Sequence, residues 1–218
     1  MERPQNIAPD IKAKRTAFAI KLVVLFHLVG LAGLLIAAAR PLFLQLVPYH
    51  LLLMMLVLFY THDGFNKKFA GFFLFVFIVG FTVEWIGVHT GKLFGNYAYG
   101  PTLGLQIDDI PVIMGINWFL LIYATGVTLQ YLPIKAISVR VFAGALLLVL
   151  LDLLIEPVAI RLNYWHWVDK AIPLNNYLCW FIISMAFLLV FELLRFRKQS
   201  LVAVILLVCQ FIFFAALQ

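Results

Sequence analysis

The chain has 218 residues, of which 65% are hydrophobic and 12% are charged, and its mean hydropathy is +1.04. This composition excludes an ordinary soluble domain. The formal net charge is +6, but Lys and Arg lie in short segments between apolar runs, so we predict no nucleic-acid partner. Apolar runs in lipid must satisfy their own backbone hydrogen bonds, and here they are continuous rather than alternating. We therefore predict an all-α, polytopic membrane helix bundle surrounded by lipid.

The chain contains seven candidate membrane spans. A span needs about 20 apolar residues, and the candidates lie at residues 17–39, 42–60, 69–89, 111–131, 139–158, 173–194 and 201–217. Pro48 interrupts the second of them. Residues 1–16 are polar and lack the features of a removable signal peptide. We expect them to form a cytoplasmic tail ahead of a single transmembrane domain over residues 17–218.

The basic residues support this count and indicate an orientation. Cytoplasmic connections of membrane proteins are enriched in Lys and Arg. With the N-terminus inside, 12 of the 16 basic residues fall on the inner side and 4 on the outer side. We therefore predict seven transmembrane helices with a cytoplasmic N-terminus. The two long connections, 90–110 and 159–172, then lie outside, and long connections more often carry function.

The cysteines and histidines give no sign of a metal site. Cys179 and Cys209 both lie in apolar runs, so we expect neither a disulfide nor metal ligation from them. A helical di-iron centre would need several His or Glu residues at repeated i, i+3 or i+4 spacings. We predict no metal ion. His27 and His50 are isolated within predicted helices, and we interpret both as structural residues.

Three acidic residues lie in predicted helices at a similar depth. A charge at the bilayer centre costs about 3 kcal/mol even on lenient scales, so such residues are functional candidates. At 1.5 Å of rise per residue, Glu84 lies about 8 Å, Asp152 about 9 Å and Glu156 about 3 Å below the outer ends of their helices. Asp152 and Glu156 are four residues apart and share one helix face. Glu192 is set apart, because we expect it to pair with Arg195 at the inner interface.

Polar and aromatic residues near the same depth are candidates for binding a substrate. They are Asn117, Trp118, Asn176 and Trp180 within the spans, and His89, Tyr97, Tyr99 and Trp165 in or beside the outer connections. Each type has a structural alternative. Tryptophan forms belts at membrane interfaces, where His89 also fits, and asparagine forms hydrogen bonds between membrane helices.

Three blocks of residues recur in a known family. The first runs from Glu84 to Tyr99 and contains Phe94-Gly95-x-Tyr97-x-Tyr99, and the second runs from Pro111 to Trp118. The third runs from Asp152 to Trp180 and contains Glu156-Pro157, Trp165-x-Trp167 and Pro173-x-x-Asn176. Together they resemble the carotenoid biosynthesis membrane protein family that includes the carotenoid 1′,2′-hydratases. Glu156 stands where this family more often has Asp, and Cys179 stands where it more often has Gly.

The resemblance implies a hydro-lyase, a carotenoid 1′,2′-hydratase of a bacterial or archaeal cell membrane. Such an enzyme adds water to the terminal double bond of an acyclic carotenoid end group without a cofactor. The reaction needs a proton donor, a stabiliser of the carbocation and a delivered water. A carboxyl in a medium of low dielectric constant tends to stay protonated, and aromatic faces attract cations. We expect Asp152 to donate the proton and Glu84 or Glu156 to position the water, and an exchange of these roles stays open.

Two other functions share these features. A carotenoid end-group cyclase or isomerase begins with the same protonation but excludes water. A small-molecule or ion transporter would place acidic residues along a path through both faces, whereas here they gather near one. A retinal-binding receptor is excluded, because residues 201–217 contain no lysine for a Schiff base. The exact carotenoid and the oligomeric state stay open.

Overall fold

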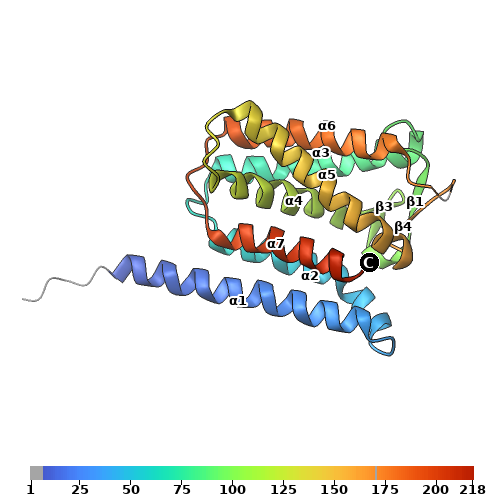
Figure 1. Cartoon of the computed structure of the whole chain (residues 1–218), viewed down its shortest axis with the longest axis horizontal. Coiled ribbons are helices and arrows are strands. Elements are labelled where there is room, and N and C mark those ends of the chain that lie inside the picture. The colour runs from blue at the N-terminus through green and yellow to red at the C-terminus, as the bar shows by residue number, and fades with distance from the viewer. Residues whose placement is uncertain (1–6, 170) are drawn as a thin grey trace, which may run out of the picture.

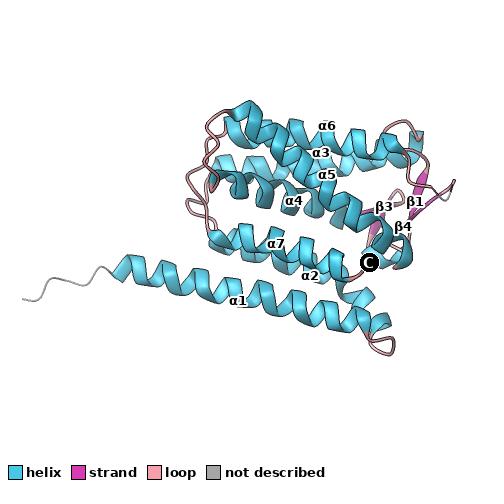
Figure 2. Ribbon diagram, viewed as in Figure 1, coloured by secondary structure: helices cyan, strands magenta, loops and turns pink. Residues whose placement is uncertain are grey.

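Seven helices run along the molecule in the computed structural model, which describes residues 7–169 and 171–218 (Figures 1 and 2). They are α1 (Ile7–Leu35), α2 (Arg40–Thr61), α3 (Lys67–Thr90), α4 (Ile113–Gln130), α5 (Ile137–Arg161), α6 (Leu174–Leu193) and α7 (Leu201–Ala216). The predicted all-α fold and the seven predicted helices are confirmed. Pro48 lies inside α2 and does not divide it.

Among the described residues, six helices are long and apolar enough to cross a membrane, so this is a multi-pass membrane protein. The exception is α7, whose 16 residues extend about 24 Å against a hydrocarbon core of roughly 30 Å. Helix α1 begins at Ile7, inside the segment expected to be a tail. Arg3 and Lys170, which entered the charge count, lie outside the described residues.

The connections alternate between the two ends of the bundle, as the charge pattern predicts. The connections at residues 62–66, 131–136 and 194–200 lie at the end where α1 begins (Figure 1). The connections that follow α1, α3 and α5 lie at the opposite end. The two long connections therefore share one end. The assignment of that end to the outer side stays a prediction.

Helix α4 is the centre of the bundle. It is the least hydropathic of the six candidate spans, at 1.3, yet 83% of that span is buried. It packs against α2, α3, α5, α6 and α7, whereas α1 lies at the edge against α2 and α7 (Figure 1). Gly80 of α3 allows a close approach, because a Cβ atom there would lie 2.9 Å from the Trp118 side chain. This contact brings α3 and the first turns of α4 together at the level of Glu84.

Local sequence sets both ends of α3, the helix that carries Glu84. The Asn66 side chain caps its start by accepting hydrogen bonds from the backbone N–H groups of Lys68, at 3.0 Å, and Phe69, at 3.2 Å. Gly91 ends the helix with a left-handed φ of 63°, a conformation that favours glycine. The chain then turns back across this end of the helix.

Two short strand pairs cover that end of the bundle. β1 (Tyr97–Tyr99) pairs antiparallel with β4 (Trp165–Trp167), and β2 (Gln106–Ile107) pairs with β3 (Ile110–Pro111) after the turn η1 (Pro101–Leu103). Tyr97 lies opposite Trp167, and Tyr99 lies opposite Trp165. Alternate residues of a strand face the same side. Four aromatic side chains therefore project from one face of the β1–β4 ribbon.

Glu192 is buried and forms an ion pair with the half-buried Arg140, a different partner from the predicted one. Its Oε1 accepts a hydrogen bond from Nε of Arg140 on α5 at 2.9 Å, and its Oε2 accepts one from the same guanidinium. The predicted pairing with Arg195 is therefore wrong. Helix α6 ends at Leu193, and Arg195 has a left-handed φ of 49° and an exposed side chain, so it no longer follows the helix face of Glu192.

Replacing Arg140 is expected to destabilise the bundle strongly. Arg140→Met leaves the Glu192 carboxylate buried without its cation, which typically lowers the free energy of unfolding by about 3–5 kcal/mol. The double variant Arg140→Met/Glu192→Leu removes both charges and should recover most of that loss. Unfolding in mixed detergent and dodecyl sulfate micelles measures both. Equal losses in the single and double variants would contradict this account.

Candidate active site

Glu84 accepts hydrogen bonds from three aromatic side chains. Its Oε2 accepts from the hydroxyls of Tyr97, at 2.6 Å, and Tyr99, at 2.7 Å. Its Oε1 accepts from Nε1 of Trp118 at 2.8 Å. Glu84 is only 3% exposed, and three donors compensate an ionised carboxylate in so buried a place. The geometry therefore suits an ionised Glu84.

The two tyrosines of β1 are suited to remain donors. Burial, with a contribution from the nearby charge of Glu84, raises the pKa of the Tyr97 and Tyr99 hydroxyls well above the usual value. Both hydroxyls therefore keep their protons throughout the physiological range. They hold the Glu84 carboxylate in one orientation.

Asp152 and Glu156 of α5 share a donor. Glu156 Oε2 accepts from the indoles of Trp165, at 3.1 Å, and Trp167, at 2.9 Å, and its Oε1 accepts from Asn176 Nδ2 at 3.2 Å. The same amide nitrogen donates to Asp152 Oδ2 at 2.9 Å. Asp152 is fully buried, and its Oδ1 has no hydrogen-bond partner among the described residues. Two buried carboxyls on one amide repel each other when both are ionised, which favours a single proton held between them.

The β1–β4 ribbon joins these two groups of acids. Tyr97 of β1 binds Glu84, Trp167 of β4 binds Glu156, and their rings lie 5.3 Å apart. Beneath the ribbon, Trp118 of α4 stacks on Trp180 of α6 at 4.4 Å. Residues from four helices and two strands are thus built into one aromatic cluster that contains three carboxyls.

A small cavity of about 20 Å³ lies within this cluster. Its lining residues are Glu84, Phe94, Tyr97, Tyr99, Met114, Glu156, Trp165, Trp167, Asn176 and Trp180. This volume is enough for one water molecule, which needs about 10–15 Å³ and two or more polar partners. Both Glu84 and Glu156 face it, whereas Asp152 is connected to it through Asn176. We call it the acid cavity.

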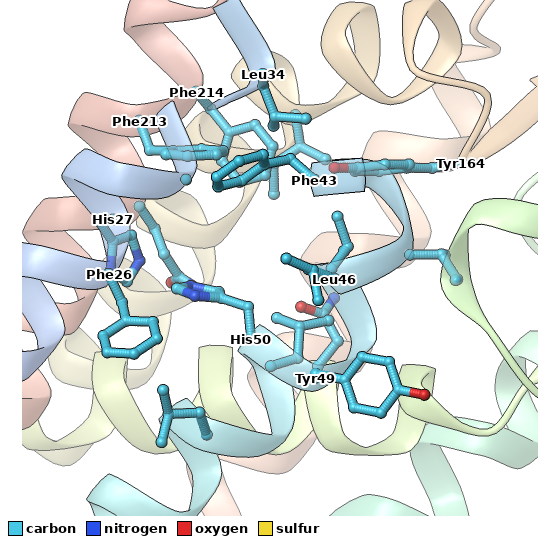
Figure 3. A pocket seen from close by; sticks show the side chains of 18 of the residues that line it. Phe26, His27, Leu34, Phe43, Leu46, Tyr49, His50, Tyr164, Phe213 and Phe214 are labelled. Carbon is cyan, nitrogen blue, oxygen red and sulfur yellow. The ribbon is translucent and has the colours of Figure 1, made fainter. Parts of the chain in front are cut away.

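A larger apolar cavity of about 400 Å³ adjoins the acid cavity (Figure 3). Met114 and Trp165 line both spaces. Figure 3 shows the rings of Phe43, Phe213 and Tyr164 along one side of the larger space, which we call the chamber. Its other lining residues include some with strongly exposed side chains, namely Phe26, Val29, Leu46 and Tyr49 of α1 and α2. The chamber therefore opens toward the lipid-facing surface between α1 and α2.

Most of the predicted site residues meet around the three carboxyls, in a group that we call the acid cluster. Those brought together are Glu84, Tyr97, Tyr99, Trp118, Asp152, Glu156, Trp165, Asn176 and Trp180. Asn117 lines the chamber instead. His89 does not contact Glu84, Asp152 or Glu156. Its Nδ1 donates to the Trp85 carbonyl at 2.9 Å, its ring stacks on Trp85, and its Nε2 lies 3.4 Å from Asp108 Oδ2.

Some residues of the two cavities were not among the predicted site residues. Trp167 binds Glu156 directly, and its spacing of two from Trp165 was the available signal for a strand with both indoles on one face. Met114 and Phe94 line the acid cavity but do not differ in type from many other apolar residues of the chain. His27 and His50, interpreted as structural, line the chamber.

A family model described as carotenoid biosynthesis protein matches residues 45–218. This chain belongs to the carotenoid biosynthesis protein family. The match includes every residue of the acid cluster and confirms the resemblance noted in the sequence. Helix α1 precedes the matched region, although α1 contributes to the chamber of this carotenoid biosynthesis protein.

A curated relative supports the family assignment. The carotenoid biosynthesis protein is 28% identical over 122 residues to bisanhydrobacterioruberin hydratase of Haloarcula japonica. The aligned region is 53% of this chain and 42% of that protein, so the chain spans less than half the length of this relative. No solved structure matches the chain significantly.

Proposed function

We propose that this protein is a carotenoid hydratase that adds water to the 1′,2′ double bond of an acyclic carotenoid end group. One observation carries the proposal. Glu84 and Glu156 line a cavity large enough for one water, directly beside an apolar chamber that opens toward lipid. The hydratase name of the Haloarcula japonica relative agrees with this chemistry. We also propose that the protein acts in the cell membrane.

The chamber suits the end of a long apolar polyene. The rest of the chain stays among the acyl chains, and the end group passes between α1 and α2 past Phe26, Leu46 and Tyr49. Within the chamber, the terminal double bond reaches Met114 and Trp165, the two side chains that also face the acid cavity. The reacting carbons are thereby placed beside the carboxyls without exposing the polyene to bulk water.

The Asp152–Glu156 pair supplies the proton in this proposal. Glu156 faces the cavity and transfers its proton to C2′, so the new C–H bond takes the electron pair of the double bond. The positive charge is left on the tertiary carbon C1′. Asp152, which does not line either cavity, acts through the shared Asn176 amide by keeping one proton on the pair. Its predicted role as direct donor is therefore reassigned to Glu156.

Glu84 and the aromatic ribbon complete the reaction. The faces of Tyr99 and Trp165 attract the carbocation without forming a bond to it. A water in the acid cavity then bonds to C1′, and the proton it loses passes to the Glu84 carboxylate. Return of that proton to Glu156 through the next water restores the site. One alkene and one water give one tertiary alcohol, and the reaction needs no oxidant or reductant.

Mass spectrometry of pigments tests the proposal. A host that makes lycopene or γ-carotene, grown in water labelled with heavy oxygen, is expected to accumulate a pigment heavier by one labelled water when it expresses this chain. The exposed-loop variant Asp109→Asn should give the same product. A pigment of unchanged mass with a shifted absorption spectrum would show cyclisation or isomerisation instead. Unchanged pigments, with folded protein present in the membrane, would also contradict the proposal.

A further inference from the structure

Besides Asn117 of α4 and two tyrosines, three polar side chains line the mostly apolar chamber. They are His27 of α1, His50 of α2 and Gln210 of α7. The two imidazole rings meet edge to face with their centres 4.8 Å apart, and Figure 3 shows both beside Phe26. Gln210 lies one turn before Phe213, whose ring lies 6.0 Å from that of His27. The two histidines therefore meet where α1 packs on α2, and Gln210 faces the same chamber from α7, which packs on both of these helices.

The side-chain oxygen of Gln210 has no hydrogen-bond partner in the described part of the chain. The residue is only 7% exposed, and its buried Oε1 accepts no hydrogen bond from any described residue. An unsatisfied buried amide oxygen is unfavourable and rare in folded proteins. A leucine of similar size would fill the same place without that cost. The amide is therefore placed where a ligand can satisfy it.

The hydrogen-bonding pattern of the three groups matches a hydroxyl. His27 Nδ1 lies 2.8 Å from the Val23 carbonyl, which only accepts, so Nδ1 carries a hydrogen and Nε2 of the neutral ring is an acceptor. Gln210 offers an acceptor oxygen and a donor amide. A hydroxyl both donates and accepts, and so satisfies such a set. A carbonyl or an ether has no hydrogen to donate.

We propose that His27, His50 and Gln210 form a hydroxyl-binding subsite that selects isoprenoid chains carrying an alcohol group. The inference deepens the proposed function and rests on it, because it takes the chamber as the substrate site. None of the three residues is among those lining the acid cavity, so the bound hydroxyl is separate from the reacting carboxyls. His27 also comes from α1, which lies outside the family match, so we expect this selectivity to depend on α1 of this chain.

Binding of matched isoprenoids tests the subsite without requiring turnover. The full-length protein in lipid nanodiscs is titrated calorimetrically with geranylgeraniol and with its methyl ether, which differ in one hydrogen-bond donor. The alcohol is expected to bind on the order of tenfold more tightly. Gln210→Leu and His27→Leu should each reduce this ratio to about one, while affinity for the ether changes by less than about twofold.

A lipid-facing change on the same helix, Val208→Leu, is the matched control and should keep the preference for the alcohol. Equal affinity of the wild type for alcohol and ether would overturn the subsite, and would indicate that the three groups hold water. An alcohol preference retained by both Gln210→Leu and His27→Leu would overturn it as well. The proposed function fails separately, because a protein that prefers the alcohol yet hydrates no carotenoid keeps the subsite and loses the hydratase assignment.

Discussion

Glu84→Gln is expected to lower the rate of carotenoid hydration by about 10²- to 10⁴-fold, the range typical of a lost general base. The amide of the variant cannot take up the proton that water releases. Its NH₂ group also faces donors from Tyr97, Tyr99 or Trp118, where the carboxylate accepts hydrogen bonds at 2.6–2.8 Å. The rate is measured as the initial accumulation of hydrated pigment, normalised to the amount of protein in the membrane.

Two comparisons separate catalysis from folding in the Glu84 experiment. Asp109→Asn makes the same acid-to-amide change in the exposed connection between α3 and α4 and should keep the wild-type rate. Tyr99→Phe removes one of the three hydrogen bonds to Glu84 and should reduce the rate by less than Glu84→Gln does. A full hydration rate in Glu84→Gln would remove Glu84 from the mechanism. A Glu84→Gln protein that is absent from the membrane leaves Tyr99→Phe as the deciding variant.

The Asp152–Glu156 pair is expected to behave as one unit. Asp152→Asn and Glu156→Gln should each lower hydration by about 10²-fold or more, because each removes one of the two carboxyls that share the proton. The double variant should be about as slow as the slower single variant, since groups that act together have strongly non-additive effects. Pigment mass spectrometry on the wild type, the two single variants and the double variant measures how strongly the effects of the two substitutions on the hydration rate depend on each other.

Additive losses among these proteins would contradict a shared proton and would favour separate roles for the two acids. A full rate in Asp152→Asn would show that Glu156 acts without it. Asn176→Asp is a further test, because it replaces the amide that bridges the two carboxyls, at 2.9 and 3.2 Å, with a third acid. We expect it to reduce hydration, while Asn163→Asp, the same amide-to-acid change at an exposed position, does not.

Helical rise, combined with the direction of each helix indicated by the basic residues, placed the three acids at one level of the bundle. The 1.5 Å rise is the same in every α-helix, so these directions and the positions of Glu84, Asp152 and Glu156 within their helices were sufficient to predict a common layer. Composition was likewise sufficient for the membrane bundle, because apolar runs in lipid have few other structures available. The structure confirms the bundle, and it places both glutamates on one cavity.

The partners of those acids depend on contacts between distant parts of the chain. Tyr97 and Trp167 are 70 residues apart, and only the register of β1 against β4 places their donors on Glu84 and Glu156. His89 lies one turn beyond Trp85 and was an equally plausible site residue, but it faces Asp108 instead. No local sequence pattern predicts these side-chain partners, because strand register and helix rotation are set by packing against neighbouring elements.

The chamber shows most clearly which features depend on packing and cannot be predicted from the sequence. Apolar residues such as Phe26 and Leu46 look alike in the sequence whether they face lipid, a neighbouring helix or a cavity, because hydrocarbon and protein interior favour the same side chains. Residue types and their spacing thus establish the membrane bundle and the acids at one end of it. The packing of α1, α2, α4 and α7 decides that an apolar space lies beside those acids, and that His27 and Gln210 face into it.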